Sequence, residues 1–256
     1  MADVDGLPIL EFDPSPNALI EASSMITPIE GLKHCVFCFF QDVIAKLVAG
    51  GRAKVIAMHS SEIGKNPLYE LDMGGRRLAV FHPGIGAPFA AAALEEIIAR
   101  GCRKFVACGG AGVLNKELAV GHLIVLSSAV RDEGTSYHYL PPAREAQPTP
   151  EALAAVVKTL DRHGAPYVVG KTWTTDAFYR ETAGKVARRR AEGCITVEME
   201  ASAFFAVAQF RGVSFAEILY AGDDLSGPQW DHREWNSRTA VRELVFNLAA
   251  EACLAM

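Results

Sequence analysis

The chain has 256 residues, of which 50% are hydrophobic and 21% are charged, with a formal net charge of −5. This length can bury a large core and favours one α/β domain over residues 1–256. The negative charge gives no reason to expect nucleic acid or an acidic membrane as a partner. The N-terminus lacks a basic n-region, and every apolar run is shorter than the ~20 residues of a membrane helix, so we expect a cytoplasmic protein without membrane contact.

The first 33 residues are rich in proline and acidic residues and predict an extended lead-in with at most one short helix. Beyond them, apolar runs alternate with amphipathic ones. Strands are expected at 34–40, 53–60, 104–108, 121–130, 167–175, 195–197 and 215–220, with a hairpin at 68–84. Helices are expected at 41–49, 89–100, 150–163, 201–210 and 236–254, and residues 178–192 read as a loop that passes into a helix. This alternation predicts a single layered α/β domain with a largely parallel sheet.

The six cysteines are scattered along the chain. Cys35 and Cys38 form a CxxC pair inside a predicted strand, where their odd separation points them to opposite faces. Zinc and thiol-redox motifs normally lie in turns or at helix starts. The pair is therefore predicted to be core cysteines, and no metal site is expected.

Acidic residues end two neighbouring predicted strands between residues 194 and 224. The first strand runs into Glu198-Met199-Glu200, and the second ends in Asp223-Asp224. Ligands of open α/β sheets bind at the carboxyl ends of strands. These carboxylates therefore predict a binding site at one rim of the sheet.

Glu198 and Glu200 share one face of an extended strand. Buried acids are costly unless they meet a ligand, a metal or a basic partner. One of these carboxylates could accept hydrogen bonds from two vicinal sugar hydroxyls, or the pair could form an ion pair with an arginine. Asp223 could act as a general acid, and Asp224 could cap the turn that follows.

Two glycine-rich stretches also follow predicted strands. PGIGAP (83–88) lacks the third glycine of a dinucleotide fingerprint, since Phe89 occupies that position, and predicts a strand-to-helix turn. GGAG (109–112) either lets a ligand approach main-chain N–H groups or forms a simple turn. The long loop 131–142 is either a structured surface loop or part of a pocket lined by Tyr137, His138 and Tyr139.

The sequence Val-Glu-Met-Glu-Ala-Ser at 197–202 resembles the ribose-binding signature of the nucleoside phosphorylase/uridine phosphorylase superfamily. This superfamily includes purine nucleoside phosphorylases and methylthioadenosine/adenosylhomocysteine nucleosidases. The motifs PGIGAP, GGAGVL, SAVRDEGTSYHYLPP, TTDAFY (174–179) and GDD follow in the order and spacing of the family, over residues 79–225.

The resemblance implies a three-layer α/β/α fold with a twisted, mixed, largely parallel central sheet. It implies a homodimer or a homohexamer (a trimer of dimers), and cleavage of a nucleoside N-glycosidic bond through an oxocarbenium-like transition state. In the phosphorylases, phosphate is the co-substrate, no further cofactor is needed, and the products are a free base and ribose 1-phosphate.

The resemblance also assigns roles to residues. Glu200 would accept hydrogen bonds from the ribose 2′- and 3′-hydroxyls, Met199 would pack against the sugar, Phe178 would stack on the base, and Asp223 would protonate purine N7. Glu198, Gly109, Gly110 and Tyr139 complete the expected substrate site. Thr182 and Gly184 occupy the positions where uridine phosphorylases carry a uracil-reading Gln and Arg, which favours a purine.

The expected phosphate site departs from the family pattern. Phe-Phe-Gln-Asp (39–42) stands in place of a Gly-Asp-Pro-x-Arg loop, and Ala107 and Gly110 stand where an Arg and a Ser or Thr are usual. Phosphate sites need strong donors, preferably bidentate cations. The remaining candidates are His82, Gly86, Arg131, Lys65 and the backbone of 109–112.

Two alternatives to phosphorolysis stay open. A phosphate-independent nucleosidase would need a carboxylate to activate water, for which Asp42, Glu21 and Glu62 are candidates. A non-catalytic nucleoside-binding protein would keep only the ribose and base site. The loop 226–235, with its segment Trp230–Trp235, would either cover the base pocket as a lid or pack on the surface.

Overall fold

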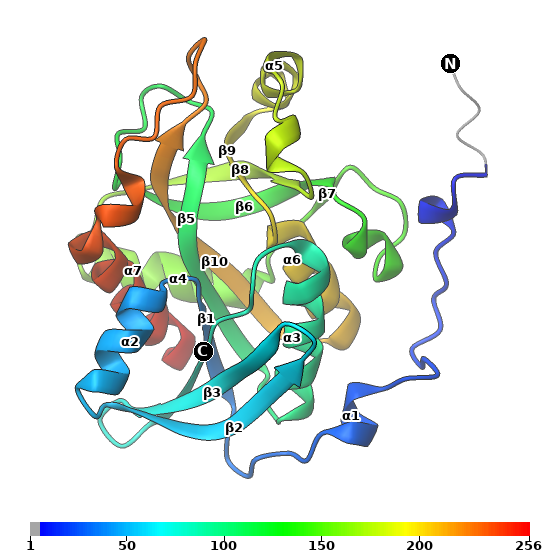
Figure 1. Cartoon of the computed structure of the whole chain (residues 1–256), viewed down its shortest axis with the longest axis vertical. Coiled ribbons are helices and arrows are strands. Elements are labelled where there is room, and N and C mark those ends of the chain that lie inside the picture. The colour runs from blue at the N-terminus through cyan, green and yellow to red at the C-terminus, as the bar shows by residue number, and fades with distance from the viewer. Residues whose placement is uncertain (1–5) are drawn as a thin grey trace.

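The computed structural model describes residues 6–256, and residues 1–5 of the predicted lead-in lie outside them. The rest of the lead-in is largely exposed and extended, with the short helices η1 (Pro8–Leu10) and α1 (Ala22–Met25). It runs along the outside of the molecule and reaches the body of the fold beside α3 (Figure 1).

The remaining chain alternates strands and helices close to the predicted bounds. The strands are β1 (His34–Cys38), β2 (Ala53–Ser61), β3 (Gly64–Asp72), β4 (Arg77–Phe81), β5 (Lys104–Val113), β6 (Leu123–Asp132), β7 (Glu145–Ala146), β8 (Tyr167–Thr175), β9 (Cys194–Glu198) and β10 (Ser214–Asp224). The helices are α2 (Gln41–Ala49), α3 (Ala87–Ala99), α4 (Pro150–Arg162), α5 (Ala183–Ala191), α6 (Ala201–Arg211) and α7 (Thr239–Leu254).

All ten strands form one mixed sheet in the order β10-β6-β8-β9-β5-β1-β4-β3-β2, with β7 paired to β6. β5 also pairs with β10, so the strands β5, β10, β6, β8 and β9 close on themselves. β2, β3 and β4 form an antiparallel meander beyond this closed part. The mixed α/β sheet that the sequence predicts is confirmed, and the meander and the antiparallel partners of β5 and β6 make its antiparallel share larger than expected.

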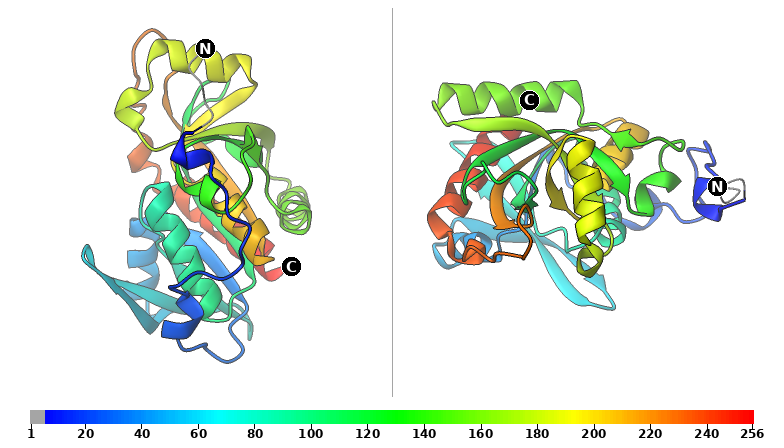
Figure 2. Two further views of the ribbon diagram at one scale, coloured as in Figure 1. Left: turned by 90° about the vertical axis from the view of Figure 1, so that its right-hand side faces the viewer. Right: turned by 90° about the horizontal axis from the view of Figure 1, so that it is seen from above.

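Helices cover both faces of the sheet. α2, α4 and α7 pack on one face with Val36, Val106 and Ile218, whereas α3 and α6 pack on the other with Phe37, Phe105 and Phe215. Figure 2 shows the sheet from its edge with helices on either side. Successive residues of β1 enter opposite cores because side chains alternate along a strand.

Five of the six cysteines belong to these two cores, and Cys194 packs in a smaller cluster with Trp173 and Val197. Cys35 faces the α3/α6 side and Cys38 the α2/α4/α7 side, and all six cysteines are buried and free. Within residues 6–256, the His, Cys, Asp and Glu side chains form no cluster suited to a metal ion. Over the same residues, every helix is too short or too polar to cross a membrane.

One junction of the sheet positions the candidate site. At its carboxyl end, β5 pairs with β10 in parallel and with β9 in antiparallel fashion, with Gly112 opposite Val197. β9 ends there at Glu198, and β10 ends at Asp224. The two acidic strand ends are therefore delivered to the same rim.

Candidate active site

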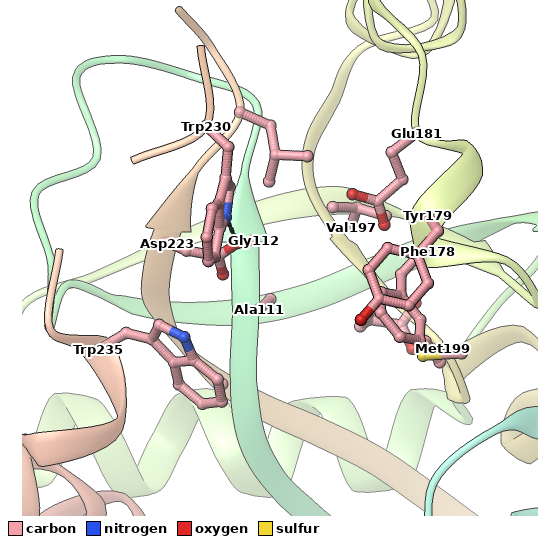
Figure 3. Close-up of a pocket in the computed structure, with 13 residues that line it drawn as sticks. Ala111, Gly112, Phe178, Tyr179, Glu181, Val197, Met199, Asp223, Trp230 and Trp235 are labelled. Carbon is pink, nitrogen blue, oxygen red and sulfur yellow. Dashed lines mark hydrogen bonds between the residues drawn. The ribbon is translucent and has the colours of Figure 1, made fainter. Parts of the chain in front are cut away.

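A cavity of about 590 Å³ opens at this junction. It is lined by Gly110, Ala111, Gly112, Phe178, Tyr179, Glu181, Val197, Glu198, Met199, Asp223, Leu225, Trp230 and Trp235 (Figure 3). The expected residues Gly110, Phe178, Glu198, Met199 and Asp223 are thus brought together, from three strands and the segment after β8.

Aromatic rings form two opposite sides of the cavity. Phe178 and Tyr179 come from the short helix η3 (Phe178–Arg180), and Trp230 and Trp235 come from the loop after β10. Figure 3 shows the two groups facing each other across Ala111 and Gly112. Phe178 is 49% exposed and Tyr179 is 89% exposed, so these rings are available to a ligand. Aromatic sides above a small floor suit a flat heteroaromatic base.

Gly112 keeps the floor of the cavity low. A Cβ atom at this position would lie 2.6 Å from Leu225 Cδ1 and 3.0 Å from Val197 Cγ1, so these two side chains would have to move to accommodate it. The GGAG stretch (109–112) is part of β5 rather than a separate turn. Gly112 has no side chain, which allows β5, β9 and β10 to pack closely at this point.

Glu198 lines the cavity, and both of its carboxylate oxygens accept hydrogen bonds from other groups of the protein. Oε2 accepts from the main-chain N–H groups of Glu200 and Ala201, both at 2.6 Å, and Oε1 accepts from the Thr174 hydroxyl at 2.6 Å. The carboxylate thereby satisfies N–H groups at the start of α6. Burial raises the pKa of Glu198 to about 7.

Glu200 lies at the start of α6, next to Met199, and is 6% exposed. Its Oε1 accepts a hydrogen bond from the Gly86 N–H at 2.5 Å, so the turn 83–88 and the strand end of β9 meet. Gly84 makes this turn possible, because a Cβ there would lie 1.8 Å from the Phe89 ring. Glu200 is not among the residues that line the cavity, although its neighbours Glu198 and Met199 are.

Burial, and then the neighbouring Glu198 carboxylate, raise the pKa of Glu200 to about 8. Within the described residues, neither glutamate forms a salt bridge, so the structure does not contain the arginine ion pair that was one reading of this strand end. A costly buried carboxylate without a basic partner is typical of a site that meets a polar ligand.

The raised pKa of Glu200 predicts a pH-dependent stability. Below the ordinary pKa of 4.5, Glu200 is protonated in both the folded and unfolded states, so its ionisation does not affect the free energy of unfolding. As the pH rises towards about 8, the unfolded chain ionises first, so the free energy of unfolding falls. The change Glu200→Gln removes this penalty. We expect its effect on the free energy of unfolding to be more stabilising at about pH 8.5 than at about pH 4.5, by roughly 2–5 kcal/mol.

Chemical denaturation of both proteins at the two pH values measures this difference. Gln retains an oxygen that can accept from the Gly86 N–H, so the comparison isolates the charge. An equal stability difference at both pH values would contradict the assignment of a raised pKa to Glu200.

Asp223 and Asp224 have different environments at the end of β10. Asp223 Oδ2 accepts a hydrogen bond from Trp230 Nε1 at 2.6 Å, and the side chain faces the cavity. Asp224 Oδ1 accepts from the Ser226 N–H at 2.7 Å, and its other oxygen pairs with Arg233. Asp224 thus caps the turn that follows, as one reading of the sequence predicts.

Glu181 also lines the cavity, although the sequence analysis did not single it out. Figure 3 shows its carboxyl group directed into the cavity from the side opposite Asp223. Burial, followed by the charge of Asp223, raises the pKa of Glu181 to about 7. The signal in the sequence was its place three residues after Phe178, directly before Thr182.

Six of the expected residues are not part of the cavity lining: Glu200, Gly109, Tyr139, His82, Gly86 and Arg131. The Arg131 guanidinium donates to the Ser136 hydroxyl and to the carbonyls of Leu140 and Pro141, which closes the loop 131–142 on itself. The Tyr139 ring packs edge-on against Phe210, on the outer side of α6. Burial raises the pKa of Tyr139 to about 12. The loop brings neither Arg131 nor Tyr139 to this cavity. Its residues His138 and Tyr139 instead line a second cavity of about 830 Å³, between the lead-in and α3.

The remaining anion candidates lie near the turn that contacts Glu200. His82 Nδ1 accepts from the Gly84 N–H at 3.1 Å, and burial lowers the pKa of His82. The Gly86 N–H is already donated to Glu200, and Gly109 lies one residue before the cavity floor, against the Phe39 ring. Lys65 is exposed on β3.

The three carboxylates considered for water activation are not part of the cavity lining. Asp42 pairs with Arg242 at 3.1 Å, and Glu21 pairs with Arg211 at 3.5 Å. Glu62 lies at the exposed turn between β2 and β3. From the loop 226–235, Trp230 and Trp235 line the cavity, whereas residues 226–229 line a separate hollow beside α5.

Comparison with known proteins agrees with the resemblance to the nucleoside phosphorylase/uridine phosphorylase superfamily. The family model described as "Phosphorylase superfamily" matches residues 33–255. A guanosine phosphorylase from Halorubrum lacusprofundi is 34% identical over 59% of this chain and 63% of its own length. A uridine phosphorylase from Thermococcus kodakarensis is 31% identical over 59% of this chain and 57% of its own length. The matches thus span less than two thirds of these relatives.

The fold has a counterpart among solved structures. The crystal structure of uridine phosphorylase from Vibrio fischeri superposes with a TM-score of 0.73, covering 91% of this chain and 95% of that chain at 23% identity. At this identity the likeness concerns the fold alone. The family model, however, spans nearly the whole chain, and the protein therefore belongs to the phosphorylase superfamily.

Proposed function

We propose that this protein cleaves the N-glycosidic bond of a purine nucleoside with phosphate, giving the free base and ribose 1-phosphate. The observation that carries the proposal is Asp223, a carboxyl group held at one side of a cavity with aromatic walls, close to the Glu198-Met199-Glu200 strand end. Membership in the phosphorylase superfamily supports the reaction type.

The two acidic groups of the base pocket favour a purine over uracil. Asp223 can donate a proton to purine N7, which makes the base a better leaving group. Glu181, on the opposite side, can accept from N–H groups on the far edge of the base. Uracil would instead present two carbonyl oxygens beside its N3–H, and a carboxylate repels them. Guanine offers two adjacent donors, N1–H and the 2-amino group, so we propose guanosine as the preferred substrate.

The ribose would lie over Met199, beside Glu200. A carboxylate has lone pairs for several hydrogen bonds, so Glu200 can accept from the 2′- and 3′-hydroxyls while it keeps the Gly86 N–H. As the glycosidic bond breaks, positive charge develops at C1′. The hydroxyls then become stronger donors, and their hydrogen bonds to Glu200 strengthen in the transition state.

For phosphate, we propose His82 as a donor. Because the Gly84 N–H donates to Nδ1, a neutral His82 ring carries its proton on Nε2. This ring belongs to the same segment as Gly86 and is therefore close to the proposed ribose site. The described residues that line the cavity include no lysine or arginine, which favours phosphate-independent hydrolysis as the second candidate function.

We also propose that the protein forms homodimers that assemble into hexamers. Apolar side chains are exposed on the β2–β3 hairpin, at Val55, Met58 and Ile63, and nearby at Ile85. A second subunit that covers this hairpin could supply the missing cations to the phosphate site. A monomeric mass by light scattering would contradict the assembly.

The substrate proposal is tested by base release from guanosine, inosine, adenosine, methylthioadenosine and uridine in millimolar phosphate. We expect guanosine to have the highest kcat/KM and uridine to be the poorest substrate. The variant Glu181→Gln should lower kcat/KM for guanosine about 10-fold or more, since Gln presents only one acceptor oxygen to two donors. Preference for uridine would contradict the proposal.

A further inference from the structure

The loop after β10 holds an exposed tryptophan against the proposed acid. Trp230 is 62% exposed, yet its Nε1 donates to Asp223 Oδ2 at 2.6 Å. Figure 3 shows the indole ring standing beside Asp223 at the mouth of the cavity. An exposed indole that is fixed by its N–H group is a feature that packing alone does not explain.

The loop itself is built to keep Trp230 in this position. Asp224 and Asp231 exchange two main-chain hydrogen bonds, at 2.8 and 3.0 Å, and this pairing folds the loop back onto the end of β10. Arg233 then ties the loop to the Asp224 carboxylate and to the Leu118 carbonyl. Arg233 and Glu234 both adopt positive φ angles, 51° and 49°, which a non-glycine residue accepts only where the surrounding contacts impose them.

The direction of the hydrogen bond decides where the acid proton lies. An indole N–H is a donor only, so Asp223 Oδ2 must act as an acceptor. When Asp223 carries a proton, its carbonyl oxygen is the better acceptor, so the indole N–H on Oδ2 favours the proton on Oδ1. Oδ1 lies on the side of Gly112, 3.6 Å from where a Cβ of that glycine would stand, and so borders the cavity floor.

We propose that Trp230 is a positioning residue for Asp223: its N–H group occupies Oδ2 and leaves Oδ1 to deliver the proton to the base. The inference rests on the proposed function, in which Asp223 is the general acid. Without the indole N–H, the carboxyl group can rotate about χ2 and place its proton on either oxygen, so only part of the population is correctly arranged for proton transfer.

The change Trp230→Phe tests the proposal, because it keeps an aromatic wall and removes only the donor. For guanosine we expect kcat to fall about 5- to 20-fold, the range of one lost hydrogen bond. With nitrophenyl riboside, whose leaving group needs no proton, kcat should change less than about 2-fold. Equal losses for both substrates, or no loss for guanosine, would overturn the proposal.

Trp235→Phe is the matched control. Trp235 lines the same cavity, but its hydrogen bonds run through its main chain: the carbonyl accepts from the Tyr220 hydroxyl, and the N–H donates to the His232 carbonyl. Its replacement should affect both substrates to the same extent. A selective loss with guanosine in this variant would show that any change of the wall disturbs proton transfer, and would also overturn the assignment to Trp230.

A second measurement does not depend on activity. The protein has three tryptophans, so the indole N–H signals in a nitrogen-15 NMR spectrum can be assigned by single Phe substitutions. We expect the Trp230 signal to exchange slowly with solvent despite its exposed ring, and to lose this protection in Asp223→Ala. Fast exchange in the unmodified protein would overturn the proposal even if guanosine is cleaved. If slow exchange is found but no nucleoside is cleaved, the positioning bond exists and the proposed function is the part that fails.

Discussion

Replacement of Glu200 by Gln should lower kcat/KM for guanosine by roughly 10²–10³-fold, the cost of losing a charged hydrogen-bond acceptor that acts in the transition state. Gln offers one acceptor oxygen, which the Gly86 N–H can occupy, and an amino group that opposes the ribose hydroxyls as a second donor. The lost negative charge also no longer stabilises the positive charge that develops at C1′.

A 2′-deoxynucleoside provides the internal control for this prediction. It lacks one of the two hydroxyls that Glu200 is proposed to bind, so Glu200→Gln should cost it less than it costs the ribonucleoside. The values of kcat/KM for the unmodified enzyme and the Glu200→Gln variant, each with the ribonucleoside and the 2′-deoxynucleoside, give the coupling energy between Glu200 and the 2′-hydroxyl. Since the same substitution should stabilise the fold above neutral pH, a loss of activity cannot be attributed to unfolding. An unchanged kcat/KM for guanosine would remove Glu200 from the ribose site.

Replacement of Asp223 by Asn should lower kcat for purine nucleosides by roughly 10²–10⁴-fold, the usual contribution of a positioned general acid. Asn can still accept from Trp230 Nε1 and can offer an N–H to N7, but it cannot transfer a proton. The geometry of the pocket is therefore kept while the chemistry is lost.

The leaving group distinguishes this role from simple binding. Nitrophenyl riboside releases a stable anion, so Asp223→Asn should leave its kcat within about 5-fold of the original enzyme. The two substrates would be compared in the same buffer by base release and by nitrophenol absorbance. Similar losses with both would indicate that Asp223 shapes the site without acting as an acid.

The sequence predicts the local parts of this structure well because those parts depend on local patterns. The hairpin of β3 and β4, the helix after PGIGAP, and the strand–helix–strand unit from Cys194 to Asp224 all follow from hydrophobic periodicity and glycine placement. The sequence places acidic residues at the ends of β9 and β10, but these ends meet because β10 runs parallel to β5 and β9 runs antiparallel to it at the same junction.

The closure of the strands around β5 could not be predicted in this way. Periodicity does not specify the antiparallel contact between Gly112 and Val197, since it joins residues far apart in the sequence. The same limit applies to side chains in loops. The sequence predicts Arg131 as an anion ligand. In the structure its guanidinium N–H groups instead donate hydrogen bonds to the carbonyls of Leu140 and Pro141. Glu181 was missed because only the folded chain brings η3 opposite Asp223.

The buried carboxyl groups of Glu198 and Glu200 lower the stability of the fold when they ionise. Burial raises the pKa values of Glu198 and Glu200 to about 7 and about 8, so the fold is destabilised when they ionise. Glu198 offsets part of this cost by holding the start of α6 through the N–H groups of Glu200 and Ala201. The Glu200 carboxylate accepts from the Gly86 N–H, and in the proposed function it would gain further hydrogen bonds from the ribose hydroxyls.

The most direct test of the proposed phosphorolysis is the identity of the sugar product. The protein, freed of phosphate by dialysis, would be incubated with guanosine in the absence and presence of millimolar phosphate, and the products separated by chromatography. We predict guanine release only with phosphate, together with an equal amount of ribose 1-phosphate. Guanine and free ribose formed at the same rate with and without phosphate would contradict phosphorolysis and establish a nucleosidase.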